Sequence, residues 1–254
     1  MSSVQYELSR GVARIVLDSP QRRNALSAPM LAELRGHLDA AEQDEDVRVV
    51  VLTHTGTVFS SGMDLTQVSG VAEADQPIRA FPVLLRRLWE FGKPVIGRVD
   101  GKARAGGIGL LAVCDLTFAS ASSDFAFTEV RLGLVPAVIS APLLPQVLPR
   151  PMLELCLTGE TFDAARAETL GLLNGVSADA EALDAQIERY CDMLRLGEPA
   201  ALSATKTMLR RDRAGVALAD DLEAMSALSA RFFAGPAAAE GVAAFREKRR
   251  PNWV

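Results

Sequence analysis

The run VRVVVLT at residues 47–53 constrains the fold of this 254-residue chain more than any other stretch. It is almost entirely β-branched or apolar, and it lies between a charged segment and a loop. A strand with one face in water alternates apolar and polar residues, whereas a strand buried on both faces is apolar nearly throughout. We therefore expect a strand here whose sheet is covered on both faces, as in a parallel α/β sheet.

The beginning of the chain predicts a hairpin followed by a helix. Two alternating segments, residues 4–8 and 12–17, flank an Arg-Gly pair, which is the pattern of two strands joined by a tight turn. Ser27 then suits the cap of a helix and Pro29 an early helical position. Apolar residues recur behind them at helical spacing: Leu31, Leu34, Leu38 and Ala41.

Two further strands are expected at residues 94–101 and 116–120, on either side of the sequence ARAGGIGLLAVCD. That sequence predicts an apolar helix at 108–113, opened by Gly106 and Gly107, although glycine weakens a helix by about 1 kcal/mol relative to alanine. Strands that alternate with helices favour an α/β fold built from right-handed crossover units.

The character of the chain changes near Glu181, where it becomes rich in alanine and helical in period. Pro199 and Pro236 interrupt this part of the chain, as expected between successive helices. We therefore divide the chain into an α/β core of residues 1–195 and a carboxy-terminal helical region of residues 196–254.

Composition and charge exclude several classes of protein. The formal net charge is −5, with acidic and basic residues interspersed, so we expect no nucleic-acid partner. No segment approaches the roughly 18 uninterrupted apolar residues of a membrane span, and the alternating amino terminus lacks the core of a signal peptide. We expect a cytoplasmic protein without a membrane partner. Three separated cysteines and two histidines predict reduced thiols and no metal site.

Two loops could carry chemistry. The sequence FSSGMD at 59–64 follows an expected strand, and Gly106 and Gly107 open a helix whose first N–H groups have no helical partners. Each feature alone has a structural alternative: a simple turn for the first, and close packing of a helix on a strand for the second. Together, however, N–H groups from both loops could converge on one oxygen and stabilise a thioester enolate.

Six sequence motifs span nearly the whole chain. They are RRNALS (22–27), FSSGMDL (59–65), ARAGGIGLLAVCD (103–115), TEVRLGLVPAVIS (128–140), LTGETFDAARAETLGLLNGV (157–176) and AFREKRRPNW (244–253). In this order they resemble the motifs of the enoyl-CoA hydratase/isomerase, or crotonase, superfamily. The resemblance implies a spiral of ββα units, carboxy-terminal helices that support trimerisation, and a homotrimer or a dimer of trimers. It also implies an acyl-CoA ligand, whose coenzyme A is part of the substrate, and no separate cofactor.

The resemblance assigns roles to residues by motif position. The oxyanion donors become the N–H groups of Met63 and Gly106, and the side chain at 63 should matter little. The residues implied in substrate binding are Arg23, Ala25, Ser61, Asp64, Leu65, Phe245 and Lys248. For Arg23 and Lys248, a solvated surface charge remains an alternative to a phosphate contact. The polar segment 66–80 has weak periodicity, and we expect it to border the acyl pocket.

The same resemblance points to one catalytic carboxylate. Hydratases of the family usually hold water between two glutamates, and Glu129 matches the later of these. It is the candidate general acid and base, provided that burial raises its pKa. The alternative is a surface glutamate at the end of a strand. The position of the earlier glutamate is Gly109, which has no side chain to move a proton.

With glycine at position 109 in place of the earlier glutamate, the sequence does not decide which reaction is catalysed. The motif around Glu129 resembles branched-chain enoyl-CoA and methylglutaconyl-CoA hydratases, which favours hydration of a 2-enoyl-CoA. Double-bond isomerisation needs only one carboxylate, and a non-catalytic acyl-CoA-binding protein is a third possibility. A serine hydrolase built on Ser60 or Ser61 is disfavoured, because neither lies in a GxSxG sequence and histidines are scarce.

Overall fold

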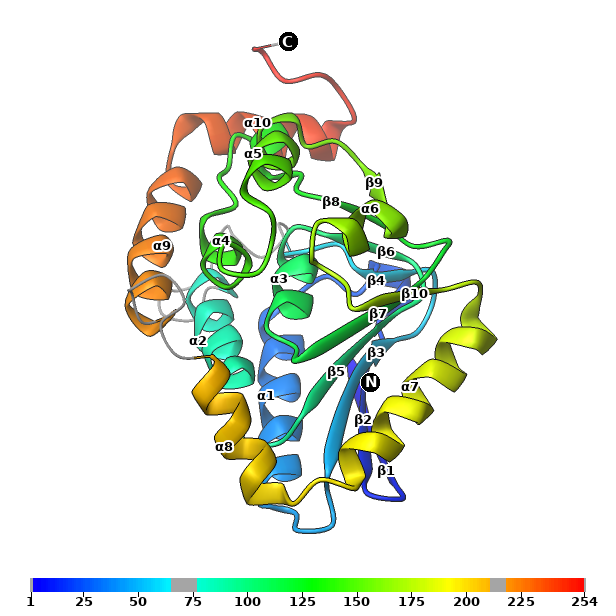
Figure 1. The fold of residues 1–254 in the computed structure, drawn as a ribbon. Coiled ribbons are helices and arrows are strands. Elements are labelled where there is room, and N and C mark those ends of the chain that lie inside the picture. Colours follow the sequence, from blue (N-terminus) through cyan, green and yellow to red (C-terminus); the bar gives the residue numbers. More distant parts are fainter. Residues whose placement is uncertain (1, 65–76, 211–217, 254) are drawn as a thin grey trace.

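The computed structural model describes residues 2–64, 77–210 and 218–253 and contains two β-sheets (Figure 1). The larger sheet has six strands in the order β1-β2-β3-β5-β7-β10, and only β1 is antiparallel to its neighbour. Its strands are β1 (Val4–Ser9), β2 (Val12–Leu17), β3 (Val49–His54), β5 (Val95–Val99), β7 (Leu116–Ser120) and β10 (Gly175–Ser177). The hairpin and the three later strands expected from the sequence are therefore confirmed.

The smaller sheet runs alongside the larger one and shows how the chain winds as a spiral of ββα units. Its order is β4-β6-β8-β9, with strands β4 (Val58–Ser60), β6 (Lys102–Arg104), β8 (Asp124–Ala126) and β9 (Phe162–Asp163). Each turn of the chain adds one strand to each sheet, in the pairs β3 and β4, β5 and β6, and β7 and β8. A helix follows each pair, so the ββα repeat of an α/β fold is confirmed.

Strand β3 is buried on both faces, as its continuous apolar run predicts. Val50 and Leu52 join the main core, whereas Val49 and Val51 pack with side chains of α7 (Ala180–Arg195) in a second core cluster. Alternate residues of a strand point to opposite faces. One face of the sheet therefore packs into the main core, and the other is covered by α7 (Figure 1).

Among the described core helices, those after Ser27, at the Gly106-Gly107 pair and near Glu181 begin close to where the sequence predicts, whereas the others were not predicted. The core helices are α1 (Ala28–Gln43), α2 (Pro77–Trp89), α3 (Gly106–Ala112), α4 (Ala137–Leu143), α5 (Pro149–Thr158), α6 (Ala164–Thr169) and α7, with 3₁₀ turns η1 (Pro20–Arg22) and η3 (Glu129–Leu132). Ser27 caps α1 by accepting a hydrogen bond from the N–H of Met30 at 3.4 Å. The segment 66–80, which we expect to border the acyl pocket, is helical from Pro77 onward, where α2 begins; residues 66–76 lie outside the described residues.

In the described part of the chain after α7 there are three helices, namely α8 (Pro199–Leu209), α9 (Leu218–Phe233) and α10 (Pro236–Glu247). Asp115 anchors α8 to the core, since its carboxylate lies 2.8 Å from Lys206 Nζ and 2.9 Å from Arg210 Nη2. Helix α9 packs along α4 and α2, and α10 packs on η3 (Figure 1). The division into residues 1–195 and 196–254 stays a prediction. No helix within the described ranges is long and apolar enough to cross a membrane.

Candidate active site

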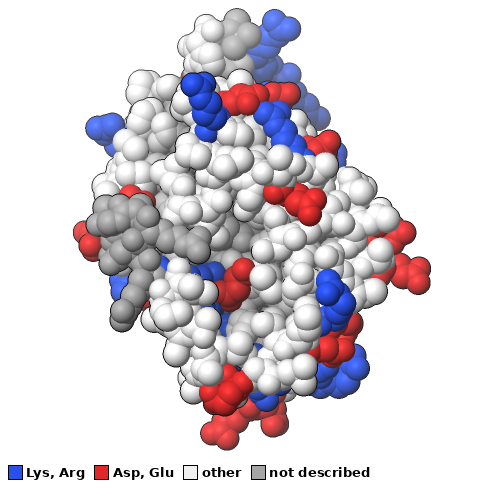
Figure 2. Space-filling model, in the orientation of Figure 1, with Lys and Arg blue, Asp and Glu red and all other residues white. Residues whose placement is uncertain are grey.

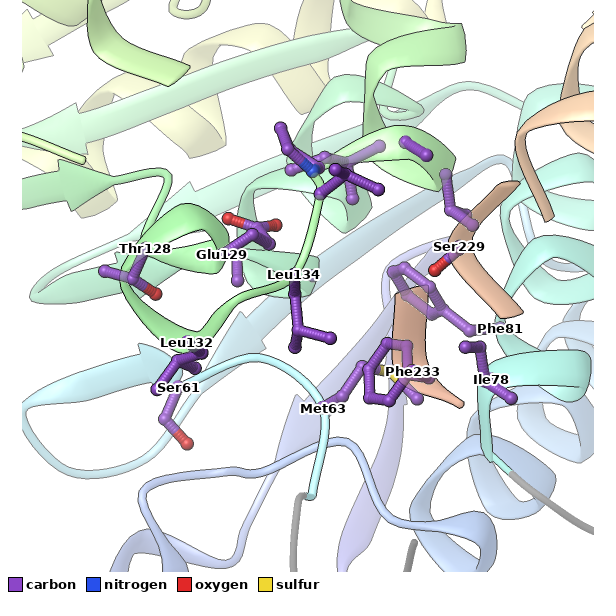
Figure 3. A pocket seen from close by; sticks show the side chains of 17 residues that line it. Ser61, Met63, Ile78, Phe81, Thr128, Glu129, Leu132, Leu134, Ser229 and Phe233 are labelled. Atoms are coloured by element: carbon purple, nitrogen blue, oxygen red, sulfur yellow. The ribbon is translucent and has the colours of Figure 1, made fainter. Parts of the chain in front are cut away.

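A pocket lies where the loop after β4, the start of α3, turn η3 and helices α2, α4 and α9 meet (Figure 3). Its volume is about 80 Å³, and most of its described lining is apolar. The side chains with polar atoms in that lining are Ser61, Thr128, Glu129 and Ser229. The pocket thus combines one ionisable group with an apolar enclosure.

The loop after β4 presents the N–H group of Met63. Leu26 lies beside this loop, donating its N–H to the carbonyl of Gly62 at 2.8 Å and accepting from the N–H of Asp64 at 3.2 Å. In this parallel bridge Leu26 bonds to the residues on either side of Met63, so Met63 itself uses neither its N–H nor its carbonyl in the bridge. The N–H of Met63 has no acceptor among the described residues.

The start of α3 lies directly against this loop. A Cβ on Gly62, whose φ is +87°, would come within 3.0 Å of Ala105 Cβ and 3.4 Å of the nitrogen of Gly106. Ala105 itself has φ 48° and ψ −118°, a strained backbone conformation of the kind that clusters at functional sites. No side chain caps α3, so the N–H of Gly106 is available at its first turn.

The two glycines that open α3, Gly106 and Gly107, are required for different physical reasons. A Cβ on Gly107 would lie 2.9 Å from the carbonyl oxygen of Ser60, so this position allows the helix to pack closely on β4. Gly106 lines the pocket beside Met63. Of the two alternatives that the sequence left open, close packing accounts for Gly107, whereas N–H donation by Gly106 stays a prediction.

The loop that contains Arg22 and Asn24 packs against the loop after β4. Asn24, in the left-handed conformation at φ 49°, donates from its side chain to the carbonyl of Val58 at 2.7 Å and accepts from the N–H of Ser19 at 2.7 Å. Arg22 pairs with the buried carboxylate of Asp64 at 2.6 Å. These contacts fix the loop that carries Met63.

Glu129 is the titratable group of the pocket. It opens η3, and its Oε2 atom is buried without a hydrogen-bond partner within the described part of the chain. Burial raises the pKa of this carboxyl to about 7, because the charged form has lost its hydration. The interpretation as an exposed glutamate at the end of a strand is therefore wrong. A pKa near neutrality suits a group that must both accept and return a proton.

Turn η3 is held in place from two sides. Arg131 donates to the carbonyl of Thr158 at the end of α5, at 3.3 Å from Nη2. On the other side α10 approaches so closely that a Cβ on Gly241 would overlap the carbonyl of Leu132. The backbone that positions Glu129 is therefore packed between α5 and α10.

Gly109 lies beneath an apolar wall. A Cβ at this position would come 2.5 Å from Ile139 Cγ2 and 3.3 Å from Phe81 Cζ. Ile139, from α4, and Phe81, from α2, also line the pocket. The space that a second glutamate would need is thus filled by hydrocarbon.

Cys156 lies close enough to Glu129 for the charge of the carboxylate to affect the pKa of the thiol. Burial, and secondly that charge, raise the pKa of its thiol to about 12. The thiol therefore stays protonated at neutral pH and is a poor nucleophile.

The predicted site residues fall into three groups. Glu129, Met63, Gly106 and Ser61 line the same pocket. Arg23, Ala25 and Asp64 lie in the two loops behind it, where the N–H of Ser61 donates to the carbonyl of Arg23 at 3.0 Å. Phe245, which is 60% exposed, and Lys248 lie at the end of α10, and Leu65 lies outside the described residues.

The surface around Lys248 is basic. Lys and Arg side chains gather over the carboxy-terminal end of α10, whereas the middle of the same face is largely uncharged (Figure 2). The exposed basic residues there are Arg246, Lys248, Arg249 and Arg250. Arg249 is already paired with Glu240 and Glu247, both at 2.6 Å, so part of this charge is neutralised within the chain.

The sequence reasoning assigned no role to most of the pocket lining, including Phe81, Ile139, Ser229 and Phe233. Ile139 stands inside a quoted motif, but nothing in that motif reveals that it packs over Gly109. The other three come from α2 and α9, whose apolar spacing indicates only that each helix has a buried face.

The comparisons with known proteins agree with this geometry. A model of the family Enoyl-CoA hydratase/isomerase matches residues 7–254. The crystal structure of an enoyl-CoA hydratase from Mycobacterium avium is 40% identical, covers 100% of both chains and superposes with a TM-score of 0.90. The 2,3-dehydroadipyl-CoA hydratase of Escherichia coli K12 is 30% identical, over 100% of this chain and 99% of that protein. Enoyl-CoA hydratase domain-containing protein 3, mitochondrial, of Danio rerio is 32% identical, over 97% of this chain and 86% of that protein. The chain therefore belongs to the enoyl-CoA hydratase/isomerase family, the crotonase superfamily, and shares its fold.

Proposed function

We propose that this protein hydrates the double bond of a 2-enoyl-CoA thioester, with Glu129 as its one catalytic acid and base. The observation that carries the proposal is the pocket itself. Glu129, with a pKa of about 7 and a buried Oε2 atom that has no partner among the described residues, shares it with the backbone of Met63 and Gly106. The relatives named as hydratases support the same class of reaction.

The mechanism uses the carboxylate twice. Ionised Glu129 takes a proton from water while the water oxygen bonds to the β carbon. The electrons of the double bond move toward the thioester carbonyl, whose developing negative charge is stabilised by the N–H groups of Met63 and Gly106. Glu129 then returns the proton to the α carbon, so water has been added and the carboxylate is restored.

Isomerisation of a 3-enoyl-CoA is the second candidate. The observation that favours it is the apolar wall of Ile139 and Phe81 over Gly109, where a second carboxylate would help to hold water. In this reaction Glu129 removes a proton from the α carbon and delivers it to the γ carbon.

One assay panel separates the candidates. Purified protein is given crotonyl-CoA, a 3-enoyl-CoA and methylglutaconyl-CoA, and binding of a saturated acyl-CoA is measured in parallel. Water addition to crotonyl-CoA or methylglutaconyl-CoA supports hydration, and turnover of the 3-enoyl-CoA alone supports isomerisation. Binding without any turnover contradicts both.

The oxyanion assignment predicts a difference between two substitutions at one position. Met63→Pro removes the N–H and should lower kcat by roughly 100- to 1,000-fold, whereas Met63→Ala keeps it and should retain most activity. The N–H of Met63 makes no hydrogen bond to the described residues, so removing it breaks no hydrogen bond among them. Steady-state kinetics, with thermal unfolding as the check on folding, measure this. Equal losses in both variants would show that the side chain matters and the N–H does not.

The pH dependence should show a single ionisation. Glu129 must start ionised for hydration and, in the reverse direction, for removal of the α proton. Because its pKa is raised to about 7, kcat/KM should fall as the pH drops below about 7 in both directions. Initial rates between pH 5 and pH 9 test this. A bell-shaped profile in that range would indicate a second catalytic acid, contrary to the proposed mechanism.

The proposal also covers the oligomeric state of the protein and its location in the cell. We keep a homotrimer or dimer of trimers, and a cytoplasmic location, as predictions of the family resemblance and of the sequence. Phe245 and Lys248 would then approach coenzyme A either within one chain or from a neighbouring copy. Sedimentation of the purified protein with and without acyl-CoA tests the assembly.

A further inference from the structure

The acyl pocket contains a serine that the proposed mechanism does not use. Ser229 lies on α9, is 6% exposed, and lines the pocket together with Glu129. In Figure 3 the two side chains stand on opposite sides of the pocket, with Leu134 between them in this view. In this view Ser229 is therefore separated from the carboxylate of Glu129.

A second serine on the same helix shows what is unusual about Ser229. The hydroxyl of Ser226 donates to the carbonyl of Leu222, one turn earlier, at 2.6 Å. The hydroxyl of Ser229 makes no such bond, and it has no partner among the described residues. Unlike Glu129 Oε2, the oxygen of Ser229 is not sealed off, so it is open to the pocket, where a ligand atom could form a hydrogen bond with it.

The surroundings of Ser229 define which ligand atom fits. Its neighbours in the pocket wall are apolar, with Phe81, Ile78 and Phe233 labelled beside it in Figure 3. No Lys, Arg or His stands among the described residues of the lining, so this part of the lining offers no cation to a negatively charged group. A carboxylate would lose its hydration at this end without a partner cation. A neutral oxygen, which can accept from or donate to the hydroxyl, meets no such penalty.

We propose that Ser229 is a specificity residue that hydrogen-bonds a neutral hydroxyl or carbonyl oxygen on the distal part of the acyl chain. The preferred substrates are therefore short 2-enoyl-CoA thioesters that carry such an oxygen, in preference to plain or carboxylated chains. This inference rests on the proposed function, because it deepens the substrate class of the same pocket.

The test compares substrates as well as variants. Wild type, Ser229→Ala and the matched control Ser226→Ala are assayed with crotonyl-CoA, a short straight-chain 2-enoyl-CoA, its ω-hydroxy derivative and its ω-carboxy derivative. For wild type, the hydroxylated substrate should have the highest kcat/KM of the three matched chains. Ser229→Ala should lower that value by about 5- to 100-fold, while the plain chain changes by less than about threefold. Ser226→Ala should leave the ratio of kcat/KM for the hydroxylated chain to kcat/KM for the plain chain unchanged.

Each outcome is decisive for this inference. An equal effect of Ser229→Ala on plain and hydroxylated chains, or no effect on either, overturns it. So does a preference of wild type for the carboxylated chain. Crotonyl-CoA reports separately on the proposed function: if it and all the other substrates are inert, hydration itself fails. In that case calorimetric binding of the saturated hydroxyacyl-CoA to wild type and Ser229→Ala still tests the role of the serine.

Discussion

Glu129→Gln should lower kcat for hydration by about 100- to 10,000-fold while a saturated acyl-CoA still binds within about threefold of wild type. Glutamine keeps the size of the side chain but has no basic oxygen that could take a proton from water. The backbone donors at Met63 and Gly106 remain, so recognition of the thioester should persist. Stopped-flow or coupled assays give kcat, and calorimetry gives the binding constant. Full turnover by the variant would reject Glu129 as the catalytic group.

The same substitution should make the protein more stable at alkaline pH. The folded-state pKa of Glu129 is about 7, above its ordinary value of 4.5, so the folded protein binds this proton more tightly than the unfolded chain. Stability is therefore lost as the pH rises from about 4.5 to about 7. Glutamine has no charge to bury, and the gain should approach about 3 kcal/mol at pH 8 and vanish near pH 4.5.

Urea unfolding at the two pH values measures this gain, with Glu160→Gln as a control because that side chain is exposed. A variant that is less stable than wild type at pH 8 would mean that the carboxylate has a favourable partner in the folded protein. Loss of activity together with a gain of stability is the signature of a group whose burial serves catalysis.

Much of the fold could be predicted because its signals are local. The apolar run at β3 reflects burial on both faces, and Ser27 followed by Pro29 marks the start of α1. Such patterns depend on neighbours in sequence, which the chain itself displays. Helix α2 escaped prediction in part because Pro77 and Pro82 lie within a segment that looks irregular, although its apolar residues pack into the core.

The candidate site divides in the same way. Met63, Gly106 and Glu129 stand in motifs that identify them, and the structure brings them to one pocket. The wall opposite Glu129 comes from α2, α4 and α9, whose contacts join residues far apart in the chain. No pattern along the sequence shows that Ile139 lies over Gly109, or that the hydroxyl of Ser229 lacks the bond that Ser226 makes.

Gly109→Glu should destabilise the protein by roughly 4 kcal/mol or more, a large part of the 5–15 kcal/mol typical of a folded protein. The new Cβ would overlap Ile139 Cγ2, at 2.5 Å, and the carboxylate beyond it would be buried among apolar side chains. Gly36→Glu is the matched control, because a Cβ at Gly36 on α1 meets nothing within 4 Å. That control should change stability by less than about 1 kcal/mol.

Removing the obstructing side chain should rescue the fold and alter the chemistry. In Gly109→Glu/Ile139→Ala the isoleucine that blocks position 109 is cut back, so we expect at least half of the lost stability to return. If the second carboxylate then reaches the reacting water, hydration should gain a second ionisation in its pH profile that wild type lacks. A single variant as stable as wild type would show that Ile139 moves aside freely. In that case the apolar wall would be no barrier to a second glutamate, and the one-carboxylate mechanism would lose its structural reason.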